Sequence, residues 1–335
     1  MIASLTVQAA SGFDDPIVAP ARWQAALERG ATDTVFLTPG WQRAWWESFG
    51  RGALLLWAIE RDGQLRAIAP LFADCGMVFF VGSGGSDYLD FIGDMDEAGL
   101  EAILPALREH VDGFLGCRFY HVPDRSPTGA RLAAVCARLG WACYDEGDLP
   151  APALDLAADP ERARAATEKT SLVRHERGFR RDGTLEVAHL RDAESIIEQL
   201  EPFFAQHVGR WAATSSPSLF VDPAQRAFYH RLAQHGAAAG WLRMTRVACN
   251  GAPIAFHFGA SYRGSYLWYK PSFAIELARR SPGEVLLRQL LLAAIDEGAH
   301  TFDFGLGDEA FKQRFATRTE RVRTWGVYPP GTGAQ

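Results

Sequence analysis

Two consecutive arginines, Arg279 and Arg280, stand directly before a Ser-Pro-Gly-Glu step and a long apolar run. Residues 283–298 are apolar on nearly every side, which predicts a buried helix. Ser281 at the N-cap, with Glu284 three residues later, would form a capping box. A well-capped core helix is therefore one complete interpretation of this segment.

Gly283 and the two arginines are not explained by a cap alone. A glycine in the first turn of a helix costs about 1 kcal/mol relative to alanine, and positive charge opposes the helix dipole there. Both features fit a bound anion, because free N–H groups, the dipole and arginine side chains attract phosphate. The pattern leaves the two interpretations open, an ordinary cap and a phosphate site.

Several side chains near this segment could transfer protons. His257 lies in an apolar strand and titrates near neutral pH, although a histidine there is commonly structural. Tyr269 belongs to the next strand, where its hydroxyl could protonate a leaving group or simply pack. Asp303 stands between two phenylalanines, so its carboxylate needs a partner if it is buried. Asp308 and Glu309 are further base candidates, and Asp308 can alternatively cap a helix.

The elements that must position these residues follow from periodicity. Residues 240–273 predict a three-stranded meander with tight turns at CNGA and RG. A buried helix, a strand at 300–305, a short helix at 309–315 and a last strand follow. The first half shows a similar order of meander, helix and strand. Tandem copies of one α/β unit and two unrelated meanders are both open interpretations.

These patterns predict the α/β class, with mixed sheets flanked by helices. Residues 148–160 are rich in Pro, Asp and Ala and are expected to connect two domains, 1–150 and 160–330. We expect the site in the second domain, facing the cleft between the halves. The basic segment 162–181 is either a solvated helix face or a seat for an acidic acceptor, a lipid-linked sugar phosphate or tRNA.

The composition excludes several classes of protein. The chain has 335 residues, of which 48% are hydrophobic and 22% charged, as in globular proteins. Its net charge of -6 does not favour nucleic acid as a general partner. Five cysteines without a CxxC pair argue against a zinc site or a disulfide framework, so no metal is expected. Without a signal peptide or an 18-residue apolar span, we expect a cytoplasmic protein.

A meander, a helix entered through Arg-x-x-Gly, a strand, a short helix and a last strand resemble the acetyltransferase core of the GNAT superfamily. The segment Arg280–Val285 stands in the place of that family's Arg/Gln-x-x-Gly-x-Gly/Ala loop. The stretches AFHFGASYRGSYLWYKPSF, SPGEVLLRQLLLAAIDEG and FDFGLGDEAFKQRFATR resemble more specifically the BioF2-like acetyltransferase domain of CelD-type bacterial proteins. These proteins are linked to cellulose or exopolysaccharide production. The resemblance covers residues 165–328, and the first half is only loosely similar to the N-terminal half of a Fem-like architecture.

The resemblance implies tandem GNAT-like domains, the N-terminal one degenerate and the C-terminal one an acetyltransferase. The implied donor is acetyl-coenzyme A, whose pyrophosphate the loop would hold through Arg279, Arg280, Ser281, Gly283, Glu284 and Val285. The catalytic candidates are His257, Asp303, Tyr269 and Lys312. In Fem-like relatives a lysine at the place of Lys312 offsets negative charge on the leaving group, and a solvated surface lysine is the alternative.

The implied reaction is acetyl transfer to an amine or hydroxyl of an exopolysaccharide or cell-envelope precursor, with membrane-associated polysaccharide machinery as a partner. Two alternatives stay open. One is a Fem-like transferase that uses aminoacyl-tRNA, the one case in which nucleic acid would be a partner. The other is a non-catalytic nucleotide-binding regulator of polysaccharide synthesis. Direct transfer needs no covalent enzyme intermediate, so no cysteine is expected to be essential.

Overall fold

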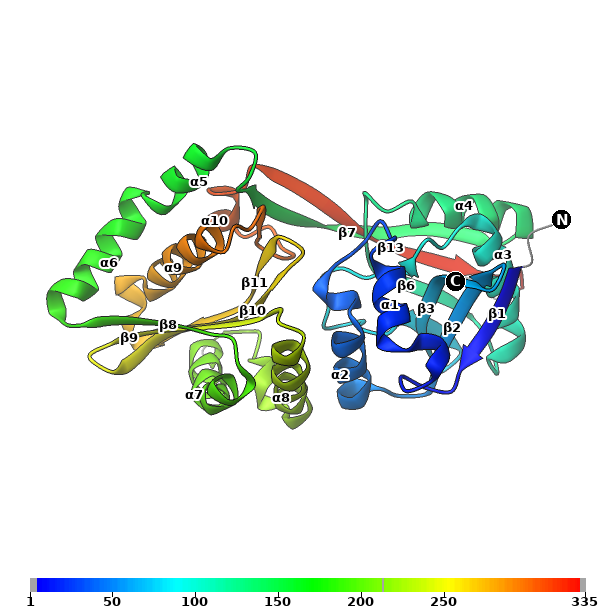
Figure 1. The fold of residues 1–335 in the computed structure, drawn as a ribbon, viewed down its shortest axis with the longest axis horizontal. Helices are drawn as coiled ribbons and strands as arrows, with labels where there is room; N and C mark the ends of the chain where they lie inside the picture. The colour runs from blue at the N-terminus through cyan, green and yellow to red at the C-terminus, as the bar shows by residue number, and fades with distance from the viewer. Residues whose placement is uncertain (1–4, 213, 332–335) are drawn as a thin grey trace. The chain divides into compact units, whose positions relative to one another are not determined.

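The computed structural model describes residues 5–212 and 214–331. The chain forms two compact units. One consists of the residues up to Pro150 together with those from Glu320 onward, and the other is Ala151–Thr319. Helices and strands alternate along both units (Figure 1), and mixed sheets are flanked by helices. The predicted α/β class is therefore confirmed.

The first unit is a mixed sheet with strand order β1-β2-β3-β4-β6-β13-β7, and β5 lies beside β3. The strands β4 and β6 are parallel. Its elements are β1 (Leu5–Ala10), η1 (Pro16–Val18), α1 (Pro20–Leu27), η2 (Val35–Leu37), α2 (Pro39–Phe49), β2 (Ala53–Arg61), β3 (Gln64–Asp74), β4 (Met77–Phe80), β5 (Ile92–Gly93), α3 (Glu97–His110), β6 (Gly116–Pro123), α4 (Thr128–Leu139), the first part of β7 (Ala142–Asp155) and most of β13 (Arg318–Tyr328).

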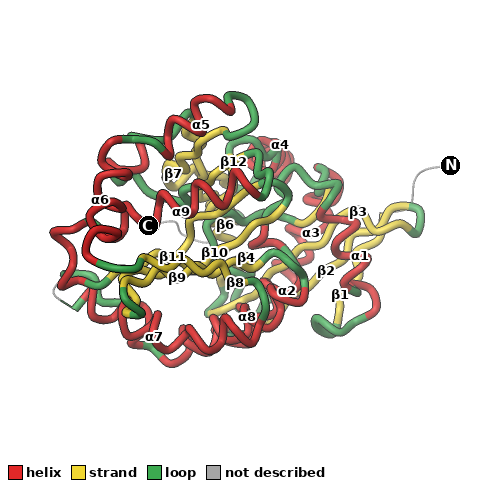
Figure 2. The backbone as a smooth tube through the Cα atoms, turned by 60° about the vertical axis from the view of Figure 1, so that its left-hand side comes forward, coloured by secondary structure: helices red, strands yellow, loops and turns green. Residues whose placement is uncertain are grey.

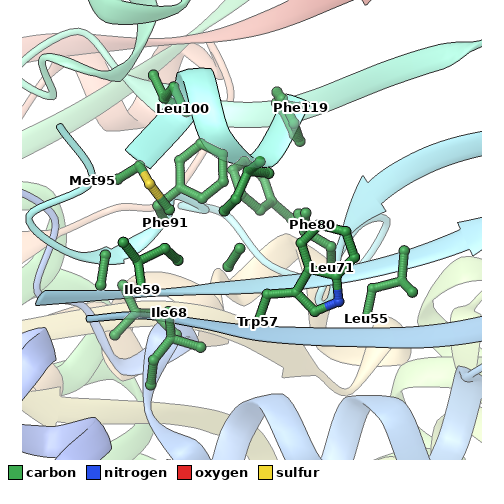
Figure 3. Close-up of a cluster of buried hydrophobic side chains, with 14 of the residues drawn as sticks. Leu55, Trp57, Ile59, Ile68, Leu71, Phe80, Phe91, Met95, Leu100 and Phe119 are labelled. Carbon is green, nitrogen blue, oxygen red and sulfur yellow. The ribbon is translucent and has the colours of Figure 1, made fainter. Parts of the chain in front are cut away.

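The core of the first unit is formed by apolar side chains from its strands and from α1, α3 and α4. The strands β2 and β3 carry nearly continuous apolar runs, as expected for strands that are covered on both faces. Figure 3 shows part of this core, with Leu55, Trp57, Ile59, Ile68, Leu71, Phe80, Phe91, Met95, Leu100 and Phe119 labelled.

The second unit has the strand order β7-β12-β11-β10-β9-β8. Its elements are the end of β7, α5 (Pro160–Thr167), α6 (Thr170–Asp182), β8 (Leu185–Leu190), α7 (Ala193–Trp211), η3 (Leu219–Val221), α8 (Pro223–Ala238), β9 (Leu242–Cys249), β10 (Ala252–Tyr262), β11 (Ser265–Phe273), η4 (Ile275–Arg280), α9 (Pro282–Asp296), β12 (Thr301–Asp303), α10 (Ala310–Gln313) and the start of β13. As in the first unit, a strand and two helices precede a meander, and a helix then leads to a strand parallel to the meander's last strand. The shared order favours the tandem interpretation of the sequence.

Helices cover both faces of the second sheet. Figure 1 shows α9 and α6 on one face and α7 and α8 on the other, and Figure 2 shows β9, β10 and β11 next to one another in a second view. Phe256 and Phe258 of β10 contact Phe203 of α7, while Trp268 of β11 packs in the cluster that contains Leu290 of α9. Two covered faces explain why these strands are apolar at consecutive positions.

The segment 148–160, predicted to connect the two domains, contains the boundary between the two compact units and also the end of a strand. The strand β7 continues through it to Asp155, and Phe302 of β12 pairs with Leu154. Leu154 is fully buried. The prolines in this segment are compatible with a strand, because a strand tolerates proline where no ladder N–H is needed.

A β-bulge interrupts the pairing of β10 with β11. Ala260 pairs with Leu267 and Phe258 pairs with Lys270. The two residues of β11 between these pairs therefore lie opposite the single Gly259. A bulge of this kind bends the strand and re-aims its backbone groups.

Among the described residues, which exclude 1–4, 213 and 332–335, no helix combines the length and apolar character needed to cross a bilayer.

The bulge makes a stability prediction. A Cβ at Gly259 would lie 2.3 Å from the Cε1 atom of His257 and 2.3 Å from the carbonyl oxygen of Leu267. Gly259→Ala should lower the free energy of unfolding by about 1–3 kcal/mol, as overpacked substitutions do. The matched control is Gly178→Ala in α6, where no atom lies within 4 Å of the added methyl group and a gain of about 0.5–1 kcal/mol is expected. If urea titrations gave both variants the same free energy of unfolding, the close packing of Gly259 in the bulge would be contradicted.

Candidate functional site

The strands β11 and β12 pair over only three residues, from Ser265 opposite Thr301 to Leu267 opposite Asp303. The shorter strand β12 ends there, whereas β11 continues to Phe273. Beyond Leu267, this edge of β11 has no strand partner in the described chain. Its backbone N–H and C=O groups must find other partners, which side chains or an extended ligand can provide.

The helix α9 begins beside the end of β11 and has no side-chain cap. Ser281 adopts a left-handed conformation, with φ 54° and ψ 54°, and its N–H donates to the Ala278 carbonyl oxygen at 3.0 Å. A capping serine needs extended backbone for its hydroxyl to reach the first-turn N–H groups. The capping box predicted from the sequence is therefore wrong, because Ser281 terminates η4 instead.

Glu284, the other member of the predicted box, is turned away from the helix start. Its carboxylate accepts a hydrogen bond from His175 Nδ1 at 2.8 Å and pairs with Arg314 at 3.2 Å. Burial opposes ionisation, but hydrogen bonds from His175, Ser171 and Arg314 outweigh it and lower the pKa of Glu284. This carboxylate is an ion-pair partner of α6 and of the segment after α10, so its predicted role toward a donor has no support in the geometry.

The fold does not require a glycine at position 283. An added Cβ would meet only the ring of Phe273, at 3.4 Å, which is an ordinary contact. The equivalent helix of the first unit, α3, is capped by Asp96, whose carboxylate accepts from Gly99 N–H at 2.9 Å. An anion would be repelled at α3, whereas the start of α9 is free of a carboxylate cap and open to close approach.

The two arginines before α9 have different environments. Arg280 donates to Asp182 at 2.7 Å, and its guanidinium lies 4.0 Å from the ring centroid of Phe179. Arg279 is exposed and has no ion pair among the described residues. The side chain of Val285 is fully buried, so only its backbone could contact a ligand. Of the predicted donor-binding residues, Gly283 and Arg279 are the two that are not held by an ion pair, a cap or burial within the described chain.

Sequence analysis missed a third cation near this position, Arg210. It lies in the last turn of α7, half-buried, and donates through Nη1 to the carbonyl oxygen of Pro271 at 2.9 Å. Its guanidinium lies 4.3 Å from the ring centroid of Phe273 and 5.3 Å from that of Trp211. The sequence signal was an arginine next to a tryptophan at the end of an aromatic-rich helix.

His257 fills the β-bulge. Its ring is fully buried, with Nε2 3.1 Å from the Leu267 carbonyl oxygen and 3.3 Å from the Tyr269 backbone nitrogen. Burial lowers the pKa of His257 to about 3, so the imidazole is neutral at physiological pH. These contacts favour a structural role in the bulge, and its catalytic role stays a prediction.

Tyr269 follows the same bulge on β11. The side chain is 8% exposed and its ring stacks on Tyr229, with 6.5 Å between centroids. Lys270 Nζ lies 4.3 Å from the Tyr269 ring centroid. The packing bears out the expectation of a buried tyrosine, while proton donation by its hydroxyl stays a prediction.

Asp303 stands where β11 and β12 part, opposite Leu267. It is half-buried, and its Oδ1 accepts from the Gly305 backbone N–H at 2.8 Å. This carboxylate lies at the end of the shorter strand, beside the unpaired edge of β11. Asp308 is exposed and does not cap a helix, since α10 starts only at Ala310. Of the acidic candidates, Asp303 has the position best suited to proton transfer.

Lys312 is buried, with 3% of its surface exposed. Its Nζ donates to the Leu306 carbonyl oxygen at 2.6 Å and pairs with Glu309 at 2.8 Å. Gly307 adopts φ 123°, and a Cβ there would lie 2.2 Å from the Glu309 carboxylate. The loop therefore encloses the Lys312 ammonium, whose partner Glu309 is exposed, and this excludes the alternative of a solvated surface lysine.

Within residues 5–212 and 214–331, no group of three or more His, Cys, Asp or Glu side chains is arranged to hold a metal ion.

Comparison with known proteins identifies the fold that this geometry belongs to. Residues 166–313 match the family described as an acetyltransferase (GNAT) domain. No curated protein sequence matches the chain. The structure of FemX is similar, with a TM-score of 0.65 and 11% identity over 93% of this chain and 96% of FemX.

Two further solved structures share the arrangement. L-PGS from Bacillus licheniformis has a TM-score of 0.53 and 15% identity over 88% of this chain and 92% of its own. A tandem GNAT protein from the clavulanic acid biosynthesis pathway has a TM-score of 0.51 and 13% identity. The match covers 99% of this chain and 100% of that protein's chain. The chain thus has the GNAT acyltransferase fold in a tandem arrangement. A CelD-type specialisation, a degenerate first domain and the predicted domain limits stay predictions.

The buried imidazole of His257 predicts how stability depends on pH. The unfolded chain binds a proton at this residue below pH 6.5, whereas the folded protein does so only near pH 3. Acidification from pH 6.5 therefore favours the unfolded state, by about 1.4 kcal/mol per pH unit for this residue. His207, whose pKa burial lowers to about 4, acts in the same direction.

The measurement is the free energy of unfolding at pH 7.5 and 5.5. His257→Gln should remove about 1.4 kcal/mol of the difference between the two pH values, and His207→Gln should remove a comparable share. If wild type and both variants lose the same stability on acidification, neither imidazole is held neutral by burial.

Proposed function

We propose that this protein is a GNAT-type acyltransferase that transfers an acetyl group from acetyl-coenzyme A to an amine or hydroxyl of an exopolysaccharide or cell-envelope precursor. One observation carries the proposal. The uncapped start of α9, with an open Gly283, lies at the end of the strand whose parallel partner has diverged. This arrangement falls within residues 166–313, which match the acetyltransferase domain.

The start of α9 suits the pyrophosphate of coenzyme A. Pro282 has no N–H, and the Glu284 N–H donates to the Ser281 carbonyl oxygen at 3.0 Å, which leaves the N–H of Gly283 to a ligand. The helix dipole favours a negative charge at this end, and Gly283 lets phosphate oxygens approach the backbone closely. The pantetheine arm, which carries amide groups, could then pair with the free edge of β11 in the manner of an added strand.

The acyl-transfer step needs a base more than a nucleophilic side chain. The acceptor nitrogen or oxygen attacks the thioester carbonyl carbon, the C–S bond breaks, and the thiolate of coenzyme A leaves. The acceptor's proton passes to a base, for which Asp303 is the best-placed candidate, and a proton from solvent or an acid returns to the thiolate. The buried ammonium of Lys312 would stabilise negative charge near the leaving group if the donor reaches it.

The acceptor is supported by resemblance alone. The stretches similar to CelD-type proteins favour a polysaccharide or envelope precursor, and membrane-associated synthesis machinery is the partner that this acceptor implies. The exposed arginines of α6 supply positive charge that a phosphorylated precursor would need.

A second candidate donor, aminoacyl-tRNA, is favoured by the burial of Lys312. A lysine held at this place fits the charge-offsetting role known from Fem-like transferases. In this reading the phosphate at α9 belongs to the terminal nucleotide of tRNA, and binding should weaken strongly with salt. A regulator that binds a nucleotide without turnover is the third reading, and it differs by lacking thioester cleavage.

Calorimetric titration with coenzyme A tests the donor site. Gly283→Asp should weaken binding about tenfold or more, which corresponds to 1.4 kcal/mol, because its carboxylate would lie where the phosphate does. The variant should still fold, since an acidic residue in the first turn stabilises a helix by about 0.3–1 kcal/mol. Gly283→Ala, which adds only a methyl group with room for it, should be at least as stable as wild type yet bind less tightly. Unchanged affinity in both variants would make α9 a core helix only.

Steady-state kinetics tests the catalytic assignment. Asp303→Asn should lower kcat about 10²–10⁴-fold, the usual loss for a positioned base, with little change in coenzyme A affinity. The half-buried Cys249 contacts the Phe179 carbonyl oxygen, and Cys249→Ser should keep nearly full activity. His257→Ala should lower kcat by a similar factor if this imidazole, rather than the carboxylate, is the base. Full turnover in both acid–base variants would refute the assignment.

A further inference from the structure

Arg210 is a half-buried cation without an ion pair among the residues that the structure describes. Its guanidinium carries five N–H groups, and within the described residues its one hydrogen bond is that to the Pro271 carbonyl oxygen. By contrast, the half-buried Arg288 pairs with Glu176 at 2.7 Å. A buried charge without a counterion is costly, and burial lowers the pKa of Arg210 accordingly. A bound anion would remove this cost.

A neighbouring donor is also without an acceptor. The indole Nε1 of Trp211 is buried and makes no hydrogen bond within residues 5–212 and 214–331, and the Arg210 guanidinium lies 5.3 Å from the Trp211 ring centroid. Two adjacent residues therefore hold donor groups without an acceptor in the described part of the chain. Unsatisfied buried donors are rare, and a ligand that only accepts hydrogen bonds, such as phosphate, would satisfy both.

Arg210 is connected to the start of α9 through one aromatic ring. Its guanidinium lies 4.3 Å from the Phe273 centroid, and the same ring is 3.4 Å from the Cβ position of Gly283. The hydrogen bond to Pro271 places it on the part of β11 that lies beyond Leu267, where β12 no longer pairs. Stacking on Phe273 and Trp211 restricts the side chain, so little further entropy is lost when it binds.

We propose that Arg210 binds a phosphate group of the donor at the start of α9, a role for which the sequence analysis named the arginines Arg279 and Arg280. This inference rests on the proposed donor site. The remaining N–H groups of the guanidinium form a planar fork that matches two phosphate oxygens, while the Gly283 N–H at the start of α9 binds the neighbouring phosphate. Arg280 is less suited to bind phosphate, because its guanidinium is already paired with the Asp182 carboxylate.

The experiment measures the affinity of wild type, Arg210→Gln and Arg280→Gln for coenzyme A and for inorganic pyrophosphate by calorimetry. Affinity for pantetheine, which carries no phosphate, is measured by ligand-observed NMR. Arg210→Gln should weaken coenzyme A and pyrophosphate about 10–100-fold, the usual loss of a charge-assisted hydrogen bond pair. Pantetheine binding should not change, and Arg210→Lys should recover part of the loss. Arg280→Gln should alter all three affinities less than about threefold, because its charge is already paired.

The outcomes separate this inference from the proposed function. If wild type binds coenzyme A and Arg210→Gln binds it equally well, Arg210 is not a phosphate ligand although the donor assignment stands. An equal loss for pantetheine would show that Arg210 only maintains the fold, and would overturn the inference as well. If wild type binds pyrophosphate in an Arg210-dependent way but not coenzyme A, the inference holds and the donor assignment fails. Binding of neither probe overturns both.

Discussion

The unequal length of two parallel strands is the constraint on which the second unit's candidate chemistry depends. The strand β12 ends at Asp303, while β11 continues for six more residues to Phe273. Backbone groups on that edge lose their natural partners, and buried groups of this kind must be satisfied in another way. Side chains provide some of the missing hydrogen-bond partners, since Arg210 donates to the Pro271 carbonyl oxygen. The remaining backbone groups on this edge of β11 are available to hydrogen-bond with an extended donor molecule.

The two units share one order of elements but treat the equivalent position differently. In the first unit, Asp96 caps α3, and Asp90, in the segment before that helix, is buried with hydrogen bonds from Thr32 and Thr128 at 2.7 and 2.6 Å. Burial raises the pKa of Asp90 even against these bonds. In the second unit the corresponding helix, α9, has no cap. One topology therefore gives a position filled by the protein's own polar groups and another that is left open to an anion.

The candidate catalytic side chains differ in how far the fold buries them. The imidazole of His257 is fully buried in the bulge that it fills, and it is neutral because burial lowers its pKa. Asp303 is only half-buried and stands where the strands part. Lys312 is enclosed but keeps a carboxylate partner in Glu309. Among these candidates, the carboxylate of Asp303 is therefore the least enclosed by the fold.

The sequence by itself determined the α/β class, the meander, the buried helix and the anomaly at Gly283, because periodicity and local propensity act over a few residues. It could not determine that Ser281 would be left-handed, that Asp182 would neutralise Arg280, or that Arg210, about 70 residues earlier in the chain, would reach the same aromatic ring as Gly283. It also did not show that the strand β7 runs through the connecting segment 148–160 as far as Asp155. Those outcomes depend on which distant segments pack together, since ion pairs, burial and strand partners are contacts between residues far apart in sequence. Only the tertiary structure brings such residues within hydrogen-bonding distance.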